Sequence, residues 1–204
     1  MEIQACTETK AYATPYSVLD RLVMRIDTAV RNSKSPEQMA TAAATALRPF
    51  LGHPRLLEPS QCEADSQHYR QHILHVAPDG LFSVVALVWM PGHETAVHDH
   101  VAWCAFGVHK GCEREVSFEV VEGEAETFLR PIGTVTNRVG SVSALVPPGD
   151  VHTVINPGTE VAISIHVYGA DVRQVGTAIR RRYDLPVRLE EPILAFAHAL
   201  ASGG

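Results

Sequence analysis

The spacing of hydrophobic residues changes near residue 67, from helical upstream to strand-like downstream. In residues 17–31, charged positions separate apolar residues at helical spacing, namely Val18, Leu22, Ile26 and Val30. This pattern predicts an amphipathic helix.

A second helix is predicted to begin after Ser35 and to end at Leu51, just before Gly52. Ser35 suits the N-cap position, Pro36 suits the first helical position, and Gln38 is placed to complete a capping box.

Downstream of residue 67, short runs rich in Val, Ile and aromatic residues are separated by the turn sequences PDG, PGHE, VEGE, RPIG and PPGD. Short runs bounded by such turns are typical of antiparallel strands. Many short strands in roughly a hundred residues predict a mainly β fold with N-terminal helices. The expected architecture is a jelly-roll barrel, in which the sheet folds onto itself and protects its edges.

The chain has 204 residues, of which 46% are hydrophobic, and this size suits one well-packed domain. We expect residues 1–66 to form an N-terminal helical part, residues 67–170 the β-barrel core, and residues 171–204 a C-terminal extension. Within the extension, residues 190–201 are predicted to form a short helix.

Composition argues against several classes of partner. The longest uncharged apolar run is residues 81–90, which is far shorter than the roughly 20 residues of a membrane span. The N-terminal sequence lacks the apolar segment of a secretory signal, so we expect a cytoplasmic protein. The net charge of -6, with basic residues scattered apart from residues 180–182, argues against nucleic acid.

The four cysteines contain no CxxC pair and are too few to form a disulfide framework in a protein of this size. We therefore expect free thiols at all four positions, which are Cys6, Cys62, Cys104 and Cys112.

His98 and His100 stand two residues apart, in a segment that is predicted to be a strand. Side chains at i and i+2 share a face of a strand, so both imidazoles point one way and Asp99 points the other. Two such imidazoles can chelate a metal ion, although a pair of exposed or core histidines without a metal gives the same pattern.

A second segment, residues 140–156, places His152 shortly after a Pro-Pro-Gly turn. Together the two segments resemble the two motifs of the cupin superfamily, which run as Gly, five residues, HxH, and as PxG, two residues, His, three residues, Asn. The matching positions are Gly92, His98, His100, Pro147, Gly149, His152 and Asn156. The resemblance implies a cupin double-stranded β-helix in which the three histidines bind a metal.

This chain departs from the usual cupin pattern at one ligand. Cupins usually carry a glutamate three or four residues after the HxH, where this chain has Trp103 and Cys104. Three neutral imidazoles leave the charge of a divalent ion uncompensated and leave coordination positions open, which favours anionic substrates and dioxygen. The ligand set alone does not select the metal, because three histidines also bind zinc in hydrolytic sites.

Residues 161–168 alternate between aliphatic and polar side chains, so Ser164, His166 and Tyr168 share one face of a predicted strand. Facing a metal, these three side chains can form a hydrogen-bonded relay in which His166 orients the hydroxyl of Tyr168. The alternative is that Tyr168 only lines the barrel.

Combined with the all-histidine motif, the sequence SIHVYGA resembles the cysteine dioxygenase family of cupin thiol dioxygenases, over roughly residues 69–170. The resemblance implies an oxidoreductase that holds Fe(II) with three histidines and adds both atoms of dioxygen to a small thiol. Ser164, His166 and Tyr168 would be its relay. Trp103 and Phe106 either line the pocket or belong to the core, and the sequence does not decide between the two.

Cysteine-specific members of the family carry a YxR segment whose arginine binds the substrate carboxylate. The corresponding residues here are Tyr69, Arg70 and Gln71, which resembles the bacterial subgroup associated with 3-mercaptopropionate. Because a neutral amide cannot form a bidentate ion pair with a carboxylate, another cation must supply it. The candidates are Arg173 and Arg180, since Arg70 should point away from Gln71.

Cys104 lies four residues after His100, so on a continuous strand it faces the same way as both ligands. Animal cysteine dioxygenases carry a cysteine near this place that forms a thioether with the relay tyrosine, whereas the mercaptopropionate-type enzymes usually have glycine. Cys104 is thus a candidate thioether partner of Tyr168, the alternative being a small buried hydrophobic residue. The expected substrate is a small thiol carboxylate, either 3-mercaptopropionate or cysteine.

Two other functions are compatible with the same ligands. A zinc or manganese cupin that catalyses isomerisation or hydrolysis would share the histidines but would not need the relay. A non-catalytic cupin that binds a small ligand would hold metal without turnover.

Overall fold

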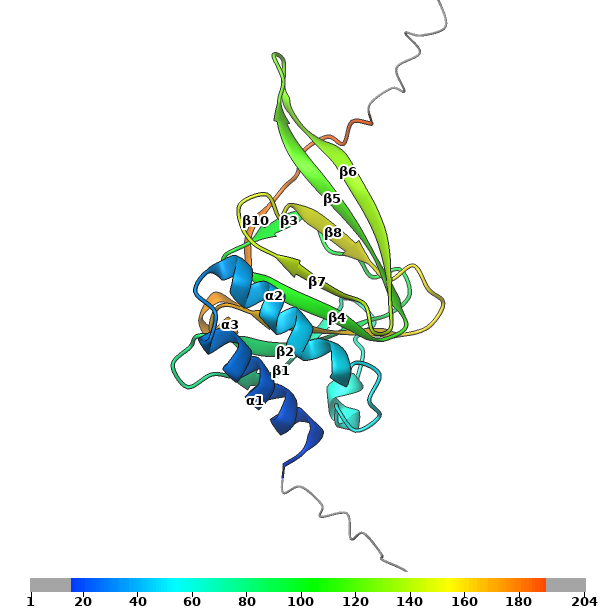
Figure 1. The fold of residues 1–204 in the computed structure, drawn as a ribbon. Coiled ribbons are helices and arrows are strands. Elements are labelled where there is room, and N and C mark those ends of the chain that lie inside the picture. Colours follow the sequence, from blue (N-terminus) through cyan, green and yellow to red (C-terminus); the bar gives the residue numbers. More distant parts are fainter. Residues whose placement is uncertain (1–15, 190–204) are drawn as a thin grey trace, which may run out of the picture.

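The computed structural model describes residues 16–189, and it begins with a helical layer that covers one face of a β-barrel (Figure 1). Helix α1, Val18–Arg31, buries its four predicted apolar residues. Ser17 caps it, because the Ser17 hydroxyl accepts a hydrogen bond from the backbone N–H of Asp20 and the Asp20 carboxylate accepts one from that of Ser17.

Helix α2, Pro36–Leu47, begins at the predicted N-cap Ser35, whose hydroxyl accepts a hydrogen bond from the N–H of Gln38. Two details of the prediction were wrong. Gln38 binds the N–H of Lys34 and not that of Ser35, so the capping box is not closed. The α-helix ends at Leu47, where the 3-10 turn η1 follows, because Pro49 has no N–H to continue the helical hydrogen bonds.

The barrel consists of two antiparallel five-stranded sheets. The helix-side sheet has the order β1, Arg70–Val76; β2, Ser83–Trp89; β9, Ala162–Tyr168; β4, Cys104–Lys110; and β7, Val142–Leu145. The hairpin-side sheet has the order β10, Ile179–Arg182; β3, His98–His100; β8, His152–Ile155; β5, Cys112–Glu122; and β6, Thr127–Arg138. The remaining elements are the short helix α3, Val172–Val175, and the 3-10 turns η1, Arg48–Phe50, and η2, Pro59–Cys62. The predicted mainly β fold with N-terminal helices is confirmed.

Strand β9 is buried along its whole length because each of its faces meets a different partner. Ile163, Ile165 and Val167 belong to the core shared with α1 and α2. The alternate residues point between the two sheets, where Tyr168 belongs to a separate apolar cluster. The helices thus seal the outside of the sheet and fix the strand whose inner face carries polar groups.

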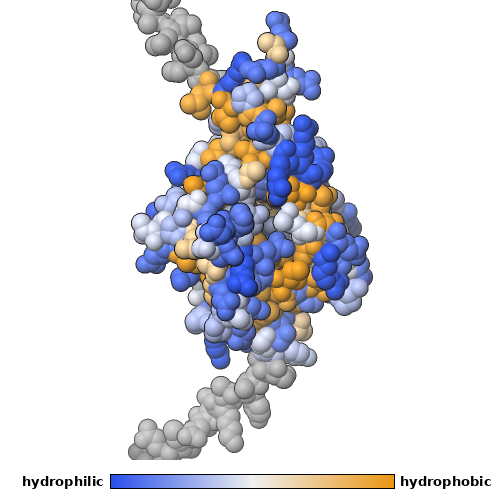
Figure 2. Space-filling model, turned by 180° about the vertical axis from the view of Figure 1, so that it is seen from behind, coloured by the Kyte–Doolittle hydropathy of each residue, from blue (hydrophilic) through white to orange (hydrophobic). Residues whose placement is uncertain are grey.

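Strands β5 and β6 form a long hairpin that projects beyond the barrel (Figure 1). Figure 2 shows the opposite face of the molecule, where hydrophilic side chains predominate and apolar ones gather at the base of this hairpin. Within residues 16–189, no helix has both the length and the hydropathy of a membrane span.

The predicted C-terminal extension adds a strand to the barrel, since β10 pairs with β3 beside the histidines. The helix predicted over residues 190–201 lies outside the described residues. Cys62, Cys104 and Cys112 are free thiols as predicted, and Cys6 lies outside the described residues.

Candidate metal centre

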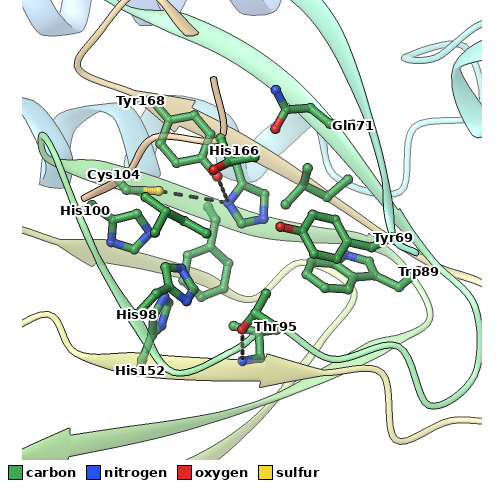
Figure 3. A pocket seen from close by; sticks show the side chains of 15 residues that line it. Tyr69, Gln71, Trp89, Thr95, His98, His100, Cys104, His152, His166 and Tyr168 are labelled. Atoms are coloured by element: carbon green, nitrogen blue, oxygen red, sulfur yellow. Dashed lines mark hydrogen bonds between the residues drawn. The ribbon is translucent and has the colours of Figure 1, made fainter. Parts of the chain in front are cut away.

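Three histidines from the hairpin-side sheet converge inside the barrel (Figure 3). His98 and His100 begin and end strand β3, and His152 begins strand β8, directly opposite His98 in the register. All three side chains are buried, and each offers one nitrogen within 4.8 Å of the others. The structure therefore brings together the three residues that the two sequence motifs select.

Each of these rings is oriented by an oxygen atom near its Nδ1. The oxygen acceptors are the carbonyl of Ala96 for His98 (3.0 Å), the carboxylate of Asp150 for His100 (2.9 Å) and the carboxylate of Glu115 for His152 (2.6 Å). Because a carbonyl or carboxylate oxygen can only accept, each Nδ1 carries a proton, and in a neutral ring the lone pair is then on Nε2. Metal-binding histidines typically have this arrangement.

The charge state of His98 also fits a metal ligand. Burial, together with the neighbouring His152 and His100, lowers the pKa of His98 to about 3, so this ring is neutral at pH 7. Asp99, between the ligands in sequence, points away as predicted, and its carboxylate accepts hydrogen bonds from Arg180 and Tyr183. The donor set is thus three imidazole nitrogens, which suits a divalent transition metal.

The polar face of β9 forms a hydrogen-bonded series opposite the histidines. Ser164 Oγ lies 2.9 Å from His166 Nε2, and His166 Nδ1 lies 3.2 Å from the hydroxyl of Tyr168. The Tyr168 and His100 rings are 6.2 Å apart, so the series ends beside the metal centre. Burial raises the pKa of Tyr168 well above its ordinary value and lowers that of His166 well below its own, so both are neutral.

Cys104 lies directly opposite Tyr168 in the pairing of β4 with β9. Its Sγ lies 3.9 Å from Nδ1 of His166 (Figure 3). Burial, and then the charges of Glu115 and Asp150, raise the pKa of the Cys104 thiol well above its ordinary value. The thiol is therefore protonated, and it shares the nitrogen that faces the tyrosine hydroxyl.

These groups line one small cavity of about 20 Å³, which is about the room that a single water molecule needs. Its walls include Tyr69, Gln71, Leu87, Trp89, Thr95, His98, His100, Cys104, Phe106, His152, Val154, His166, Tyr168, Thr177 and Ile179. Of the two aromatic residues left open by the sequence, Phe106 lines the cavity and stacks on the ring of His166. Trp103 is not a wall: it belongs to the core shared with the helices, where it packs on Gly169.

A wider groove of about 600 Å³ adjoins this cavity and shares Tyr69, Gln71 and Thr177 with it. Tyr69 is held by stacking on Trp89, with ring centroids 4.6 Å apart. Gln71 makes a long hydrogen bond of 3.5 Å from Nε2 to the carbonyl of Gly176. The shared residues therefore form the boundary between the metal cavity and the groove.

The two arginines expected to bind a carboxylate lie elsewhere. The guanidinium of Arg173 forms two hydrogen bonds with Asp171, at 2.9 and 2.8 Å, and Arg180 pairs with Asp99. Neither side chain lines the cavity or the groove, because each is turned to an aspartate outside them. Arg70 points away from Gln71 as predicted and pairs with the exposed Glu63.

Several residues that shape the site were missed at the sequence level. Asp150 and Glu115 orient two of the ligands, and Arg182 lines the groove with a guanidinium that makes no hydrogen bond or ion pair to a described residue. Asp150 could have been found, because it ends the turn that precedes His152. Glu115 and Arg182 act from other strands, so their contacts depend on a register that a local motif does not reveal.

Residues 61–181 match the protein family described as Cysteine dioxygenase type I, which is more than half of the chain. The chain belongs to this family. Membership agrees with the two-sheet topology and with the predicted cupin double-stranded β-helix. The finer assignment to the bacterial 3-mercaptopropionate subgroup stays a prediction.

A similar curated protein is cysteine dioxygenase type 1 of Danio rerio, which is 24% identical over 119 residues. The aligned part is 57% of this chain and 59% of that protein, so the chain spans less than two thirds of the relative's length.

Among solved structures, a double-stranded β-helix protein of Klebsiella pneumoniae subsp. pneumoniae MGH 78578 is 20% identical, with a TM-score of 0.42 over 62% of this chain and 94% of that one. A cupin 2 conserved barrel protein of Salinispora arenicola CNS-205 is 24% identical, with a TM-score of 0.40 over 55% of this chain and 83% of that one.

Proposed function

We propose that this chain is a metal-dependent thiol dioxygenase, which adds both atoms of dioxygen to a small thiol and yields the sulfinate. The main support for this proposal is that one buried cavity contains both a three-histidine metal site and the tyrosine of the relay. Three histidine nitrogens converge there, and the ring of a relay tyrosine, Tyr168, lies beside that of His100. An isomerase, a hydrolase or a non-catalytic ligand-binding protein could use the same histidines, but none of them would need the relay.

The proposed cofactor is Fe(II), held by His98, His100 and His152. When bound, iron would favour the thiolate form of the substrate and provide redox chemistry for dioxygen. The three ligands are neutral and bring no negative charge of their own. The carboxylates of Asp150 and Glu115 lie behind two of the ligand rings, so the open side of the ion would present its positive charge to the substrate, which favours an anionic thiol over a neutral one.

Tyr168 is proposed to hydrogen-bond the substrate or dioxygen beside the ligands. Burial keeps its hydroxyl protonated, and His166 fixes its direction through the 3.2 Å contact. Apolar walls such as Leu87 and Phe106 limit the water around these groups. Exclusion of water strengthens each polar contact that the cavity makes with a bound molecule.

The proposed substrate is a small thiol carboxylate, 3-mercaptopropionate or cysteine, whose carboxylate points outward past Gln71. Because Arg173 and Arg180 are paired with aspartates, neither is free to bind this carboxylate in the described arrangement. Arg182 lines the adjoining groove, and its guanidinium forms no ion pair with a described residue. We therefore assign the outer end of the substrate to Gln71 and Arg182.

The test is to load the protein with Fe(II) without oxygen and then to follow dioxygen uptake and sulfinate formation. The thiols are 3-mercaptopropionate, cysteine, cysteamine and mercaptosuccinate, and His152→Ala is the variant that should lose the metal. One sulfinate formed per dioxygen consumed supports the proposal. Bound iron with no thiol consumed would favour the ligand-binding alternative, and activity that needs zinc or manganese would favour an isomerase or hydrolase.

A further inference from the structure

Glu113, on strand β5, is a buried acid with no task in the function proposed above. Its side chain is fully buried, and neither carboxyl oxygen makes a hydrogen bond of standard geometry with a described residue. Asn137, its direct partner on β6, is also buried and leaves its Nδ2 unpaired. Buried carboxyl groups normally have hydrogen-bond partners, so this one needs an explanation.

The neighbours of Glu113 connect it to the relay. The Ser164 hydroxyl on β9 and the Trp89 indole on β2 lie close enough to favour its charged form, whereas Glu115 on β5 opposes that form. Burial has the largest effect and raises the pKa of Glu113 to about 7. Glu113 thus changes charge in the physiological range at the end of the relay that is remote from the metal.

Ser164 links the charge state of Glu113 to His166, because the Ser164 hydroxyl can make only a limited set of hydrogen bonds. A hydroxyl has one proton to donate and two lone pairs. The indole N–H of Trp89 donates to Ser164 Oγ at 3.1 Å and occupies one lone pair. One proton and one lone pair remain for His166 Nε2, at 2.9 Å, and for Glu113. If Ser164 donates to Glu113, it must accept from His166.

The hydrogen bond that His166 makes with Ser164 also determines the one that it makes with Tyr168, because a neutral imidazole has a single N–H. With the proton on Nε2, donated to Ser164, Nδ1 is an acceptor and the hydroxyl of Tyr168 donates to it. With the proton on Nδ1, that nitrogen donates to the oxygen of Tyr168. The tyrosine proton is then free to be donated into the cavity.

We propose that Glu113 is a positioning residue that selects the tautomer of His166 through Ser164, and thereby decides whether Tyr168 donates or accepts in the metal cavity. Ionised Glu113 can only accept, so it forces Ser164 to donate to it and places the proton of His166 on Nε2. Protonated Glu113 removes this constraint and allows the Nδ1–H tautomer. The tautomer itself does not depend on the proposed dioxygenase activity, whereas any effect on turnover does.

The test is ¹⁵N NMR of the histidine-labelled, metal-free protein between pH 6 and 8, because the chemical shifts distinguish protonated from unprotonated ring nitrogens. The signals of His166 are assigned from their loss in His166→Gln. In the wild type, the proton should move from Nδ1 to Nε2 as the pH rises, with a midpoint near pH 7. Glu119→Gln, an exposed position on the same strand, should leave this change intact.

Glu113→Gln should abolish the pH-dependent change, because the amide never carries a negative charge. Ser164→Ala should abolish it as well, because the link between Glu113 and His166 is cut. A tautomer of His166 that does not change with pH in the wild type, or a change that survives in either variant, would overturn the proposal. If the tautomer switches but no thiol is oxidised, the positioning role stands and the dioxygenase function fails.

Discussion

Glu115 Oε1 lies 2.6 Å from Nδ1 of His152, so a strand that contributes no ligand orients one of the three. Glu115 is on β5, the inner strand of the projecting hairpin, and His152 is on β8, its neighbour in the sheet. Asp150 does the same for His100 from the turn before β8. The hairpin therefore belongs to the metal centre, although its tip lies far outside the barrel (Figure 1).

Glu115→Ala should weaken metal binding about 10- to 100-fold, because His152 loses the acceptor that fixes its tautomer and its ring orientation. Competition with a chromophoric chelator measures the affinity for Fe(II) or Zn²⁺. Glu119→Ala, on the same strand but exposed, is the control and should bind metal as the wild type does. Equal affinities for the wild type and Glu115→Ala would show that this contact does not support the ligand.

Tyr168→Phe should keep the metal and lose most of the catalysis. The variant removes only the hydroxyl, which touches His166 and not a ligand, so the metal content should stay at the wild-type level. Removal of one preorganised hydrogen-bond donor typically lowers kcat about 100-fold. The measurement is sulfinate formation per metal bound, and an unchanged rate would exclude Tyr168 from the reaction.

The parts of the site that follow from local spacing could be predicted from sequence. His98 and His100 share a face because a strand alternates, and the same rule aligned Ser164, His166 and Tyr168. By contrast, the directions of Arg173 and Arg180 could not be read from sequence, because the chain leaves β9 after Tyr168 and bends through α3 before it becomes β10. Outside regular structure, residue spacing no longer fixes where a side chain points.

Contacts between strands that are distant in the chain are the second feature of the site that could not be predicted from the sequence. Glu113 lies near Ser164 because β5 of one sheet contacts β9 of the other, and Arg182 reaches the groove because β10 pairs with β3. Both relationships depend on the order of strands that are distant in the chain. A motif of a few residues carries no information on that order.

Cys104 stays a candidate thioether partner of Tyr168, because the register places the two residues directly opposite each other. The new C–S bond replaces the S–H bond of the cysteine and a ring C–H bond of the tyrosine, and dioxygen accepts the two hydrogens. Mass spectrometry should therefore find a fraction of the protein lighter by two hydrogen atoms, with both residues in one crosslinked peptide. A Cys104→Ser variant should lack it. An unchanged mass after many turnovers would mean that no thioether forms and that Cys104 serves only in packing.

Arg182→Met should raise the KM for mercaptosuccinate and 3-mercaptopropionate about tenfold, since a charge-assisted contact of about 1–2 kcal/mol is lost. The kcat should change little, because Arg182 lies in the groove and not beside the ligands. Cysteamine has no carboxylate, so its KM should not rise. Arg181→Met is the matched control, because that guanidinium lies over the ring of Tyr183. A rise in KM for cysteamine as well would mean that the substitution distorts the groove.

Glu113 should also make the stability of the fold depend on pH. Its pKa is raised from 4.5 to about 7, so between these values the folded state binds a proton more tightly than the unfolded state does. The free energy of unfolding therefore falls as the pH rises through this range, by about 3 kcal/mol in total. Above about pH 7 the contribution no longer changes, because the acid is then ionised in both states.

Glu113→Gln removes this titration, so its stability relative to the wild type should increase between pH 5 and pH 8. Urea denaturation at the two pH values measures the free energy of unfolding, with Glu119→Gln as the control that should follow the wild type at both. Even if the amide packs poorly and the variant is less stable throughout, the difference between the two pH values remains diagnostic. The same loss of stability at pH 5 and pH 8 would mean that Glu113 is ionised in the folded protein across this range, and its link to Ser164 would then carry no switch.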